Sequence, residues 1–199
     1  MLKIGITGGI GSGKTTICDF FSLLGAPIFN ADQEAKWLMQ HTQKLIEDIQ
    51  QVIGQKSYNN DGSINRKHIA QIVFNNVDKL KQLNQLVHPF VLEHYNQWCS
   101  KQTHTSFIVH ESALLYESGF WKHNDYNILV QAPQALRIKR IIKRDGLSKQ
   151  EIEKRMAQQW TDKQKVNLAD YVIKNDETVL VLPQALKLYK EFYNLNQKQ

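Results

Sequence analysis

The segment Leu2-Lys3-Ile4-Gly5-Ile6-Thr7 and the next segment, Gly8-Gly9-Ile10-Gly11-Ser12-Gly13-Lys14-Thr15, decide the fold of this chain. The first is a short apolar run that predicts a buried strand. The second has the pattern G-x-x-x-x-G-K-[ST], the P-loop, and residues 16–24 continue it with apolar side chains at helical spacing. A strand, a glycine loop and a helix in this order form the context in which a P-loop binds phosphate.

Each part of this loop has a chemical purpose. Glycines let backbone N–H groups turn toward a phosphate chain, and the positive end of the next helix faces the same oxygens. Lys14 would reach the β- and γ-phosphates, and the Thr15 hydroxyl is placed to bind Mg²⁺. The plain alternative is a glycine-rich turn that only joins a strand to a helix. The dinucleotide pattern G-x-G-x-x-G fails, because from Gly9 or Gly11 its last position falls on Lys14 or Thr16.

Composition limits the remaining possibilities. A chain of 199 residues with 42% hydrophobic and 22% charged residues predicts a compact globular protein. The net charge of +6 favours anionic partners without choosing among metabolites, nucleic acid and membranes. We find neither a membrane-length apolar run nor a leader-like start, and we expect Cys18 and Cys99 to be ordinary thiols in a reducing cytosol. A cytoplasmic location without a membrane partner is expected.

The sequence also distinguishes among P-loop proteins. The N-K-x-D and D-x-x-G strings of common GTPases do not occur, which disfavours a nucleotide switch. An RNA-binding ATPase would use the positive charge on a nucleic-acid backbone, but no RNA-recognition motif is visible. A small-molecule kinase remains, and we expect no nucleic-acid partner and a monomer, with weak self-association as the alternative.

The later apolar runs predict an α/β fold, a P-loop kinase-like core with a five-stranded parallel sheet flanked by helices. The four further strands are expected at residues 26–29, 106–110, 126–131 and 170–173, and a carboxy-terminal helix at 182–193. The core is expected to comprise residues 1–32, 106–135 and 167–199. Residues 33–105 show helical patterns over 44–53, 66–74, 77–87 and 90–99, the last two separated by His88-Pro89. We expect this segment to be a helical substrate-binding subdomain.

Two carboxylates follow predicted strands. Asp32 would lie at the sheet edge that carries the P-loop, where it could accept or orient the proton of an attacking hydroxyl, or hold Mg²⁺ through water. The alternative is that Asp32 is only the N-cap of the next helix. Glu111 stands where a Walker-B aspartate is expected, and the sequence leaves open whether it replaces that residue or Mg²⁺ is held mainly by Thr15, phosphates and water.

A basic run begins at Arg137 and predicts a lid over residues 136–166. One helix face carries Arg137, Arg140 and Arg144, and the other carries Ile138, Ile141 and Ile142. A second helix, N-capped at Ser148 ahead of Glu151, carries Arg155. A solvated charged face is the alternative. In a lid, arginines would neutralise the transferred phosphoryl group, and Arg140, Arg144 and Arg155 are the candidates.

At this point the sequence resembles the dephospho-CoA kinases, from Ile4 to Asn175. The matching residues, in order, are Thr7-Gly8-Gly9-Ile10-Gly11-Ser12-Gly13-Lys14-Thr15, Ala31-Asp32, Leu83-Asn84, His88-Pro89, Leu114-Leu115-Tyr116-Glu117, Arg144-Asp145, Gln159 and Val172-Ile173-x-Asn175.

This resemblance implies ATP-dependent phosphorylation of the 3′-hydroxyl of dephospho-CoA, the last step of coenzyme A synthesis. It implies an ATP site at Gly11, Ser12, Gly13, Lys14, Thr15 and Thr16. It implies Asp32 at the acceptor hydroxyl and His88 near it in the substrate domain, and we add Arg66 as a further acceptor-binding residue. The catalytic set is then Lys14, Asp32, Arg140 and Arg144, with Mg²⁺ on Thr15. Trp160 is expected to pack internally or, alternatively, to meet adenine.

Two departures from the family pattern stand out. The family often has D-A-D where this chain has Asn30-Ala31-Asp32, and often P-L-L where it has Ala113-Leu114-Leu115. The first matters only if the missing carboxylate is the base. The runner-up function is a kinase for a nucleoside or nucleotide, which the choice of acceptor would reveal.

Overall fold

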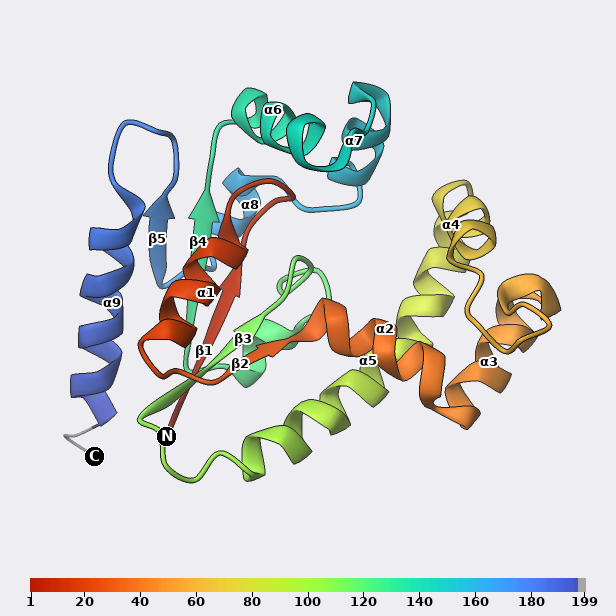
Figure 1. Cartoon of the computed structure of the whole chain (residues 1–199), viewed down its shortest axis with the longest axis horizontal. Coiled ribbons are helices and arrows are strands. Elements are labelled where there is room, and N and C mark those ends of the chain that lie inside the picture. The colour runs from red at the N-terminus through yellow and green to blue at the C-terminus, as the bar shows by residue number, and fades with distance from the viewer. Residues whose placement is uncertain (197–199) are drawn as a thin grey trace. The chain divides into compact units, whose positions relative to one another are not determined.

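A five-stranded parallel sheet forms the centre of the larger part of the molecule (Figure 1). The computed structural model describes residues 1–196. The strand order is β2-β3-β1-β4-β5. The strands are β1 Leu2–Thr7, β2 Ile28–Asn30, β3 Phe107–Glu111, β4 Tyr126–Gln131 and β5 Tyr171–Lys174. The predicted parallel α/β sheet is confirmed, with strand ends shifted by at most two residues.

The strand register brings the ends of distant segments to one edge. β1 lies between β3 and β4, with Ile6 opposite both Glu111 and Ile128. On the far side of β3, Asn30 at the end of β2 lies opposite Glu111. Because all strands are parallel, their carboxyl ends share the edge at which the P-loop begins.

Two helices cover one face of the sheet and bury its apolar side chains. α1 (Lys14–Leu23) buries Ile17 and Phe21, and α9 (Val181–Asn196) buries Leu188 and Phe192. The two helices contact each other and β3. These side chains belong to one core with the strand residues Ile4, Ile6, Val109, Ile128 and Ile173. Each fully buried side chain of this size contributes about 1.5–3 kcal/mol, so this core fixes α1 firmly behind the P-loop.

Three more helices lie beyond β4 in sequence, namely α6 (Gln134–Asp145), α7 (Lys149–Met156) and α8 (Asp162–Val166), and a short helix η2 (Phe120–His123) precedes β4. The capping box predicted at Ser148 and Glu151 is confirmed, whereas α8 was not predicted. The alternative of a solvated charged face is wrong for Arg137, which is buried because the first turn of α6 packs against the P-loop. On the apolar face, Ile141 is buried and Ile142 is 45% exposed.

The remaining helices form a second compact unit, residues Ala31–Trp98. They are α2 Ala31–His41, α3 Gln43–Ile53, η1 Gln55–Ser57, α4 Arg66–Phe74 and most of α5 Val77–Ser100. We call this part the helical unit and call Met1–Asn30 together with the residues from Cys99 onward the sheet unit. The role of the helical unit in binding a substrate stays a prediction.

The helix break predicted at His88-Pro89 is wrong, because α5 runs through Pro89 without interruption. Proline has no N–H to donate to the carbonyl four residues earlier, so it weakens a helix at that point. Here buried side chains recur every four residues on both sides of it, at Leu83, Val87, Val91, Tyr95 and Cys99. This continuous apolar stripe outweighs the lost hydrogen bond.

Cys18 and Cys99 are both free thiols and both are buried. Burial raises the pKa of the Cys18 thiol well above its ordinary value. Among residues 1–196, no helix combines the length and the apolar character that a membrane crossing requires.

His110 gives a prediction about folding stability. It is buried on β3 between the rings of Phe29 and Phe120, and burial lowers its pKa from 6.5 to about 4. Between pH 6.5 and about pH 4, His110 is protonated in the unfolded chain and neutral in the folded chain. The free energy of unfolding therefore falls as the pH falls through this range. From pH 7 to pH 5 we expect the free energy of unfolding to drop by about 2 kcal/mol more in the natural protein than in His110→Gln.

Urea titrations at both pH values measure this difference, with His104→Gln, on the surface loop before β3, as the control. Equal losses in the natural protein and in His110→Gln would show that His110 is protonated without cost in the folded state.

Candidate active site

The non-helical part of the P-loop ends at Gly13, the residue before α1, whose backbone has φ of 92° and ψ of 18°. This left-handed conformation suits glycine, and an added Cβ would lie 2.2 Å from Asn175 Nδ2. Within the described chain, no side chain caps α1 and no acidic residue lies in its first turn. The first backbone N–H groups of α1 therefore remain suited to an anion. The loop fits a phosphate chain.

Glu111, at the end of β3, lies against the start of α1. It is 4% exposed, and its Oε1 accepts a hydrogen bond from Thr15 Oγ1 at 3.1 Å. The same oxygen lies 4.0 Å from Lys14 Nζ. The sequence left the role of Glu111 open. In the structure its carboxylate lies beside Lys14 and Thr15, the two residues that end the P-loop pattern. A hydroxyl and a carboxylate side by side are the oxygen ligands that Mg²⁺ prefers.

Asn30 explains one departure from the family pattern. Its Nδ2 donates a hydrogen bond of 2.6 Å to Glu111 Oε2. An aspartate at this position would bring a second carboxylate against Glu111, and one of the two would then favour its protonated form. The amide instead donates a hydrogen bond to Oε2 while Oε1 accepts from Thr15, which fixes the orientation of the Glu111 side chain. Asn30 and Glu111 thus form a matched pair in this chain.

Asp32 lies in the first turn of α2, which begins one residue earlier at Ala31. The alternative interpretation of Asp32 as an N-cap is therefore wrong. Only Ala31 separates Asp32 from Asn30, the residue that holds Glu111. Asp32 belongs to the helical unit, and its contact with an acceptor stays a prediction.

Among the predicted lid arginines, Arg140 is connected to the P-loop. Its Nη2 donates to Asn175 Oδ1 at 3.1 Å and to Glu177 Oε1 at 3.4 Å. Asn175 in turn donates through Nδ2 to the carbonyl of Ser12 at 2.7 Å. Arg140 Nη1 is buried and has no hydrogen-bond partner within residues 1–196. This free donor beside the P-loop favours Arg140 as an anion ligand.

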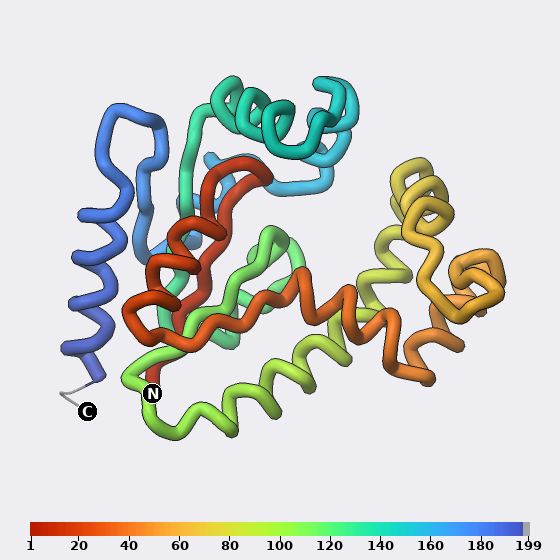
Figure 2. The backbone as a smooth tube through the Cα atoms, viewed as in Figure 1, coloured from red at the N-terminus to blue at the C-terminus, as the bar shows by residue number. Residues whose placement is uncertain are grey.

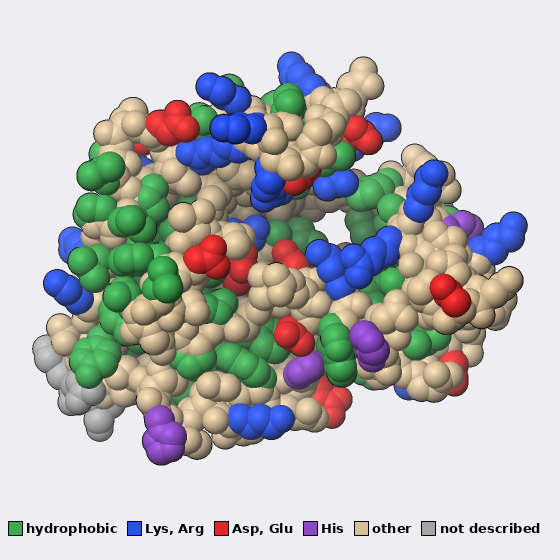
Figure 3. All heavy atoms as spheres, in the orientation of Figure 1, with side chains coloured by type: hydrophobic (Ala, Val, Ile, Leu, Met, Phe, Trp, Pro, Cys, Tyr) green, Lys and Arg blue, Asp and Glu red, His purple; other side chains and the backbone are tan. Residues whose placement is uncertain are grey.

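Arg144 and Arg155 are not brought to the P-loop in this structure. Arg144 makes two hydrogen bonds with Asp145, at 2.7 and 2.8 Å, and its side chain is 64% exposed. Arg155 is exposed on α7. Figure 3 shows that Lys and Arg side chains gather over α6 and α7. A role of Arg144 and Arg155 at the phosphates stays a prediction.

Two predicted acceptor residues lie in the helical unit. Arg66 is the first residue of α4 and lines a small apolar groove of about 200 Å³ together with Lys36, Ile69 and Phe74. His88 lies in α5, and burial lowers its pKa from the ordinary value of 6.5, which favours the neutral imidazole.

Sequence reasoning missed Arg137 and Lys165. Arg137 looked like one more arginine of a solvated face, yet it contacts Asp162 at 3.3 Å and is buried. It lines a cavity of about 590 Å³ with Gln159 and Trp160. Lys165 is completely buried, although its segment showed no apolar pattern. No local sequence signal could have identified either residue, because each is buried through contacts with distant segments. A contact of Trp160 with adenine stays a prediction.

The described residues contain no group of three or more His, Cys, Asp or Glu side chains that could bind a metal. Thr15 and Glu111 lie close enough together to hold a divalent cation jointly with oxygens from phosphate or water. Such sparse protein ligation is typical of Mg²⁺ at a nucleotide.

Comparisons with known proteins agree with this geometry. The family model described as dephospho-CoA kinase matches residues 2–180. A dephospho-CoA kinase of Chlorobium chlorochromatii (strain CaD3) is 39% identical over 197 residues, which cover 96% of this chain and 93% of the relative. Among solved structures, TT1252 from Thermus thermophilus matches with a TM-score of 0.84 at 29% identity, covering 96% of both chains. The dephospho-CoA kinase from Campylobacter jejuni matches with a TM-score of 0.68 at 27% identity, covering 98% of both.

Proposed function

Because this chain belongs to the dephospho-CoA kinase family, we propose that the P-loop edge of its sheet transfers the γ-phosphoryl group of ATP to the 3′-hydroxyl of dephospho-CoA. The products are coenzyme A and ADP. The observation that supports the proposal best is the contact of Glu111 with Thr15 and Lys14 at the start of α1. It joins a phosphate-binding loop to a carboxylate at the point where a phosphoryl group would be transferred.

On the donor side, the backbone N–H groups of residues 11–16 would bind the phosphates of ATP. Lys14 would neutralise charge on the β- and γ-phosphates, and Arg140 would add its free donor. Thr15 would hold Mg²⁺ with Glu111 beside it. A Mg²⁺ held by these residues would supply positive charge that neutralises the charge developing on the phosphoryl group. Residues 136–166 would act as the lid that excludes water, bringing Arg144 and Arg155 to the phosphates.

On the acceptor side, Asp32 would orient the hydroxyl and take its proton at a carboxylate oxygen. Arg66 and His88 would bind the remainder of dephospho-CoA. The Arg66 guanidinium suits the diphosphate group, since it can donate two parallel hydrogen bonds to phosphate oxygens. We further propose that the protein works as a cytoplasmic monomer.

The direct test is an ADP-release assay with ATP and Mg²⁺ and four acceptors in parallel, namely dephospho-CoA, AMP, CMP and adenosine. We expect turnover with dephospho-CoA alone. Turnover with a nucleotide or nucleoside would support a kinase activity but contradict dephospho-CoA as the acceptor. No turnover with any acceptor would contradict the proposed function.

Glu111→Gln tests the magnesium assignment. The amide keeps the shape of the side chain and the contact with Thr15, but it removes the negative charge beside the cation. We expect the Mg²⁺ concentration for half-maximal rate to rise roughly tenfold, since a charge-assisted contact of this kind is worth about 1.5–3 kcal/mol.

Asp19→Asn, which removes an exposed carboxylate farther along α1, is the matched control and should leave the Mg²⁺ dependence unchanged. If Glu111→Gln shows the same Mg²⁺ dependence as the natural protein, Glu111 does not act on the cation.

A further inference from the structure

Both backbone polar groups of Ile10, at the tip of the P-loop, are held by side chains from the predicted lid segment. The Ile10 N–H donates to Gln159 Oε1 at 2.8 Å. The Ile10 carbonyl accepts from Arg137 Nε at 3.1 Å. Arg137 follows β4 in the first turn of α6, whereas Gln159 lies between α7 and α8. The start of α6, which carries Arg137, and the connection from α7 to α8, which carries Gln159, therefore both contact Ile10.

The backbone path makes this arrangement visible. In Figure 2 the tube that leaves α7 passes beside the red P-loop on its way to α8. Arg137 approaches the loop so closely that a Cβ on Gly9 would lie 2.4 Å from its Cζ. Its guanidinium is already paired with Asp162, so it is not a free phosphate ligand. Arg137 therefore contacts the loop backbone at the Ile10 carbonyl, while Asp162 balances its charge.

Gln159 is suited to its place because it is an amide. While Oε1 accepts from Ile10, Nε2 donates to the carbonyl of Ala113 at 3.1 Å. One acceptor and one donor on the same planar group are needed at these two backbone positions. Ala113 lies two residues after Glu111. Gln159 therefore connects the loop tip with the segment that carries the carboxylate of the site.

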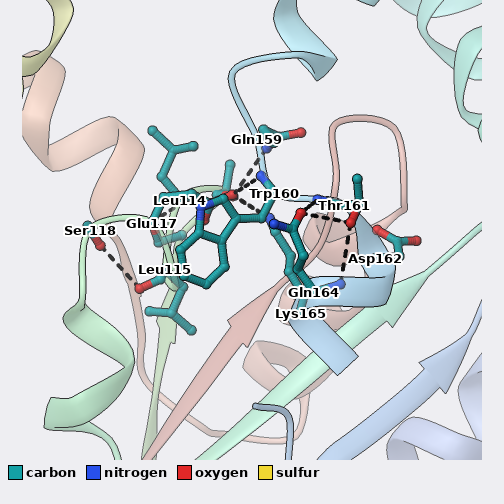
Figure 4. A network of polar contacts seen from close by, with 12 residues as sticks. Leu114, Leu115, Glu117, Ser118, Gln159, Trp160, Thr161, Asp162, Gln164 and Lys165 are labelled. Carbon is teal, nitrogen blue, oxygen red and sulfur yellow. Dashed lines mark hydrogen bonds and ion pairs between the residues drawn. The ribbon is translucent and has the colours of Figure 1, made fainter. Parts of the chain in front are cut away.

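A buried ion pair fixes the surroundings of Gln159. Glu117 Oε1 accepts from the Trp160 N–H at 2.7 Å and lies 2.9 Å from Lys165 Nζ. Lys165 Nζ also donates to the Ala113 carbonyl at 3.3 Å. These contacts close a ring from Gln159 through Ala113, Lys165 and Glu117 to Trp160, the next residue in the chain. Figure 4 shows Gln159, Trp160, Glu117 and Lys165 of this ring close together.

Burying the amine of Lys165 in this ring costs free energy. Its side chain has no exposed surface, and desolvation of a charged amine is unfavourable unless its partners are well placed. A pair of apolar side chains would often stabilise a fold equally well. What the ion pair adds is a defined geometry at Ala113 and Trp160, which are the two points that orient Gln159.

We propose that Gln159 is a positioning residue of the P-loop, and that the buried pair of Lys165 and Glu117 holds Gln159 in place. The inference rests on the proposed function, because it assumes that the P-loop binds ATP. Gln159 touches no phosphate in this scheme. It sets the position of Ile10 and thereby the backbone N–H groups that follow it.

The test begins with Gln159→Leu, which keeps the bulk of the side chain and removes both hydrogen bonds. We expect the dissociation constant of a non-hydrolysable ATP analogue, measured by calorimetry without acceptor, to rise about fivefold to thirtyfold. The Ile10 amide should also exchange its hydrogen faster in NMR measurements. Gln158→Leu, at the exposed neighbour, is the matched control. Gln159→Glu keeps the acceptor for Ile10 but turns a carboxylate oxygen toward the Ala113 carbonyl, so it should also weaken binding.

The role of the ion pair is tested by combining Lys165→Met with Glu117→Gln. This change should weaken binding of the ATP analogue in the natural background and have little further effect in the Gln159→Leu background. If this double variant does not fold, Gln159→Leu and Gln159→Glu, which leave the ion pair intact, decide the proposal alone.

Three outcomes distinguish the possible failures. An unchanged dissociation constant in Gln159→Leu overturns the inference. A lower Tm with unchanged analogue binding shows that Gln159 is merely structural. If the natural protein itself binds no analogue, the assignment of the P-loop as ATP site is wrong, which is a different failure from that of Gln159.

Discussion

Replacing Lys14 by methionine is expected to lower kcat about a thousandfold. Lys14 is the first residue of α1, its side chain is 14% exposed, and its Nζ lies 4.0 Å from Glu111 Oε1. Charge develops on the transferred phosphoryl group, and one well-placed donor in such a site is worth a factor of roughly 10² to 10³. Methionine keeps the length of the stem and removes only the charged end.

Steady-state rates with dephospho-CoA measure this effect, together with the binding of an ATP analogue. Lys190→Met, on the exposed side of α9, is the matched control and should leave both unchanged. A kcat for Lys14→Met within a factor of three of the natural value would show that Lys14 does not stabilise the transition state. Unchanged circular dichroism and Tm would show that the loss is not one of folding.

Asp32→Asn is expected to lower kcat by a factor of roughly 10² to 10⁴, the usual contribution of a general base. Asparagine has the same shape and can still orient a hydroxyl, but it cannot take its proton. Because Asp32 lies outside the P-loop, the affinity for an ATP analogue should change little. The Michaelis constant for dephospho-CoA should change less than kcat.

The matched control is Glu34→Gln, since Glu34 is the other acidic residue in the first turn of α2. Both carboxylates lie at the positive end of the helix, where each contributes about 0.3–1 kcal/mol. Glu34 also lies 3.7 Å from His94 Nδ1, so Tm is measured for both variants and the rates are compared at temperatures where both are folded. Equal rates for the two variants would mean that Asp32 stabilises the helix and does nothing more.

The parts of the fold that the sequence predicted are those with a local signature. The run before the P-loop is apolar over six residues, and the loop pattern itself requires a strand before it and a helix after it. The start and end of α4 were also predicted, and its N-cap Asn65 binds His68 N–H at 3.1 Å. Each of these signals lies within one element.

The parts that could not be predicted depend on partners that are distant in sequence. Pro89 was expected to end a helix, but packing against other elements buries the apolar stripe on both sides of it and keeps α5 continuous. The same holds for the burial of Arg137 by the P-loop. The match between Asn30 and Glu111 depends on the register of β2 against β3. Local pattern predicted the P-loop, and tertiary pairing decided which distant side chains lie beside it.

The central position of β1 affects how the chain folds during synthesis. This strand is made before the helical unit, yet its neighbours on either side, β3 and β4, are made only after the whole helical unit. Until then Ile4 and Ile6, which are fully buried in the finished protein, have no sheet to cover them. Pairing over such sequence distances is slow, and exposed strands of this kind invite aggregation. The P-loop therefore leaves the ribosome well before the distant segments that shape it, including those that carry Glu111, Arg137 and Gln159.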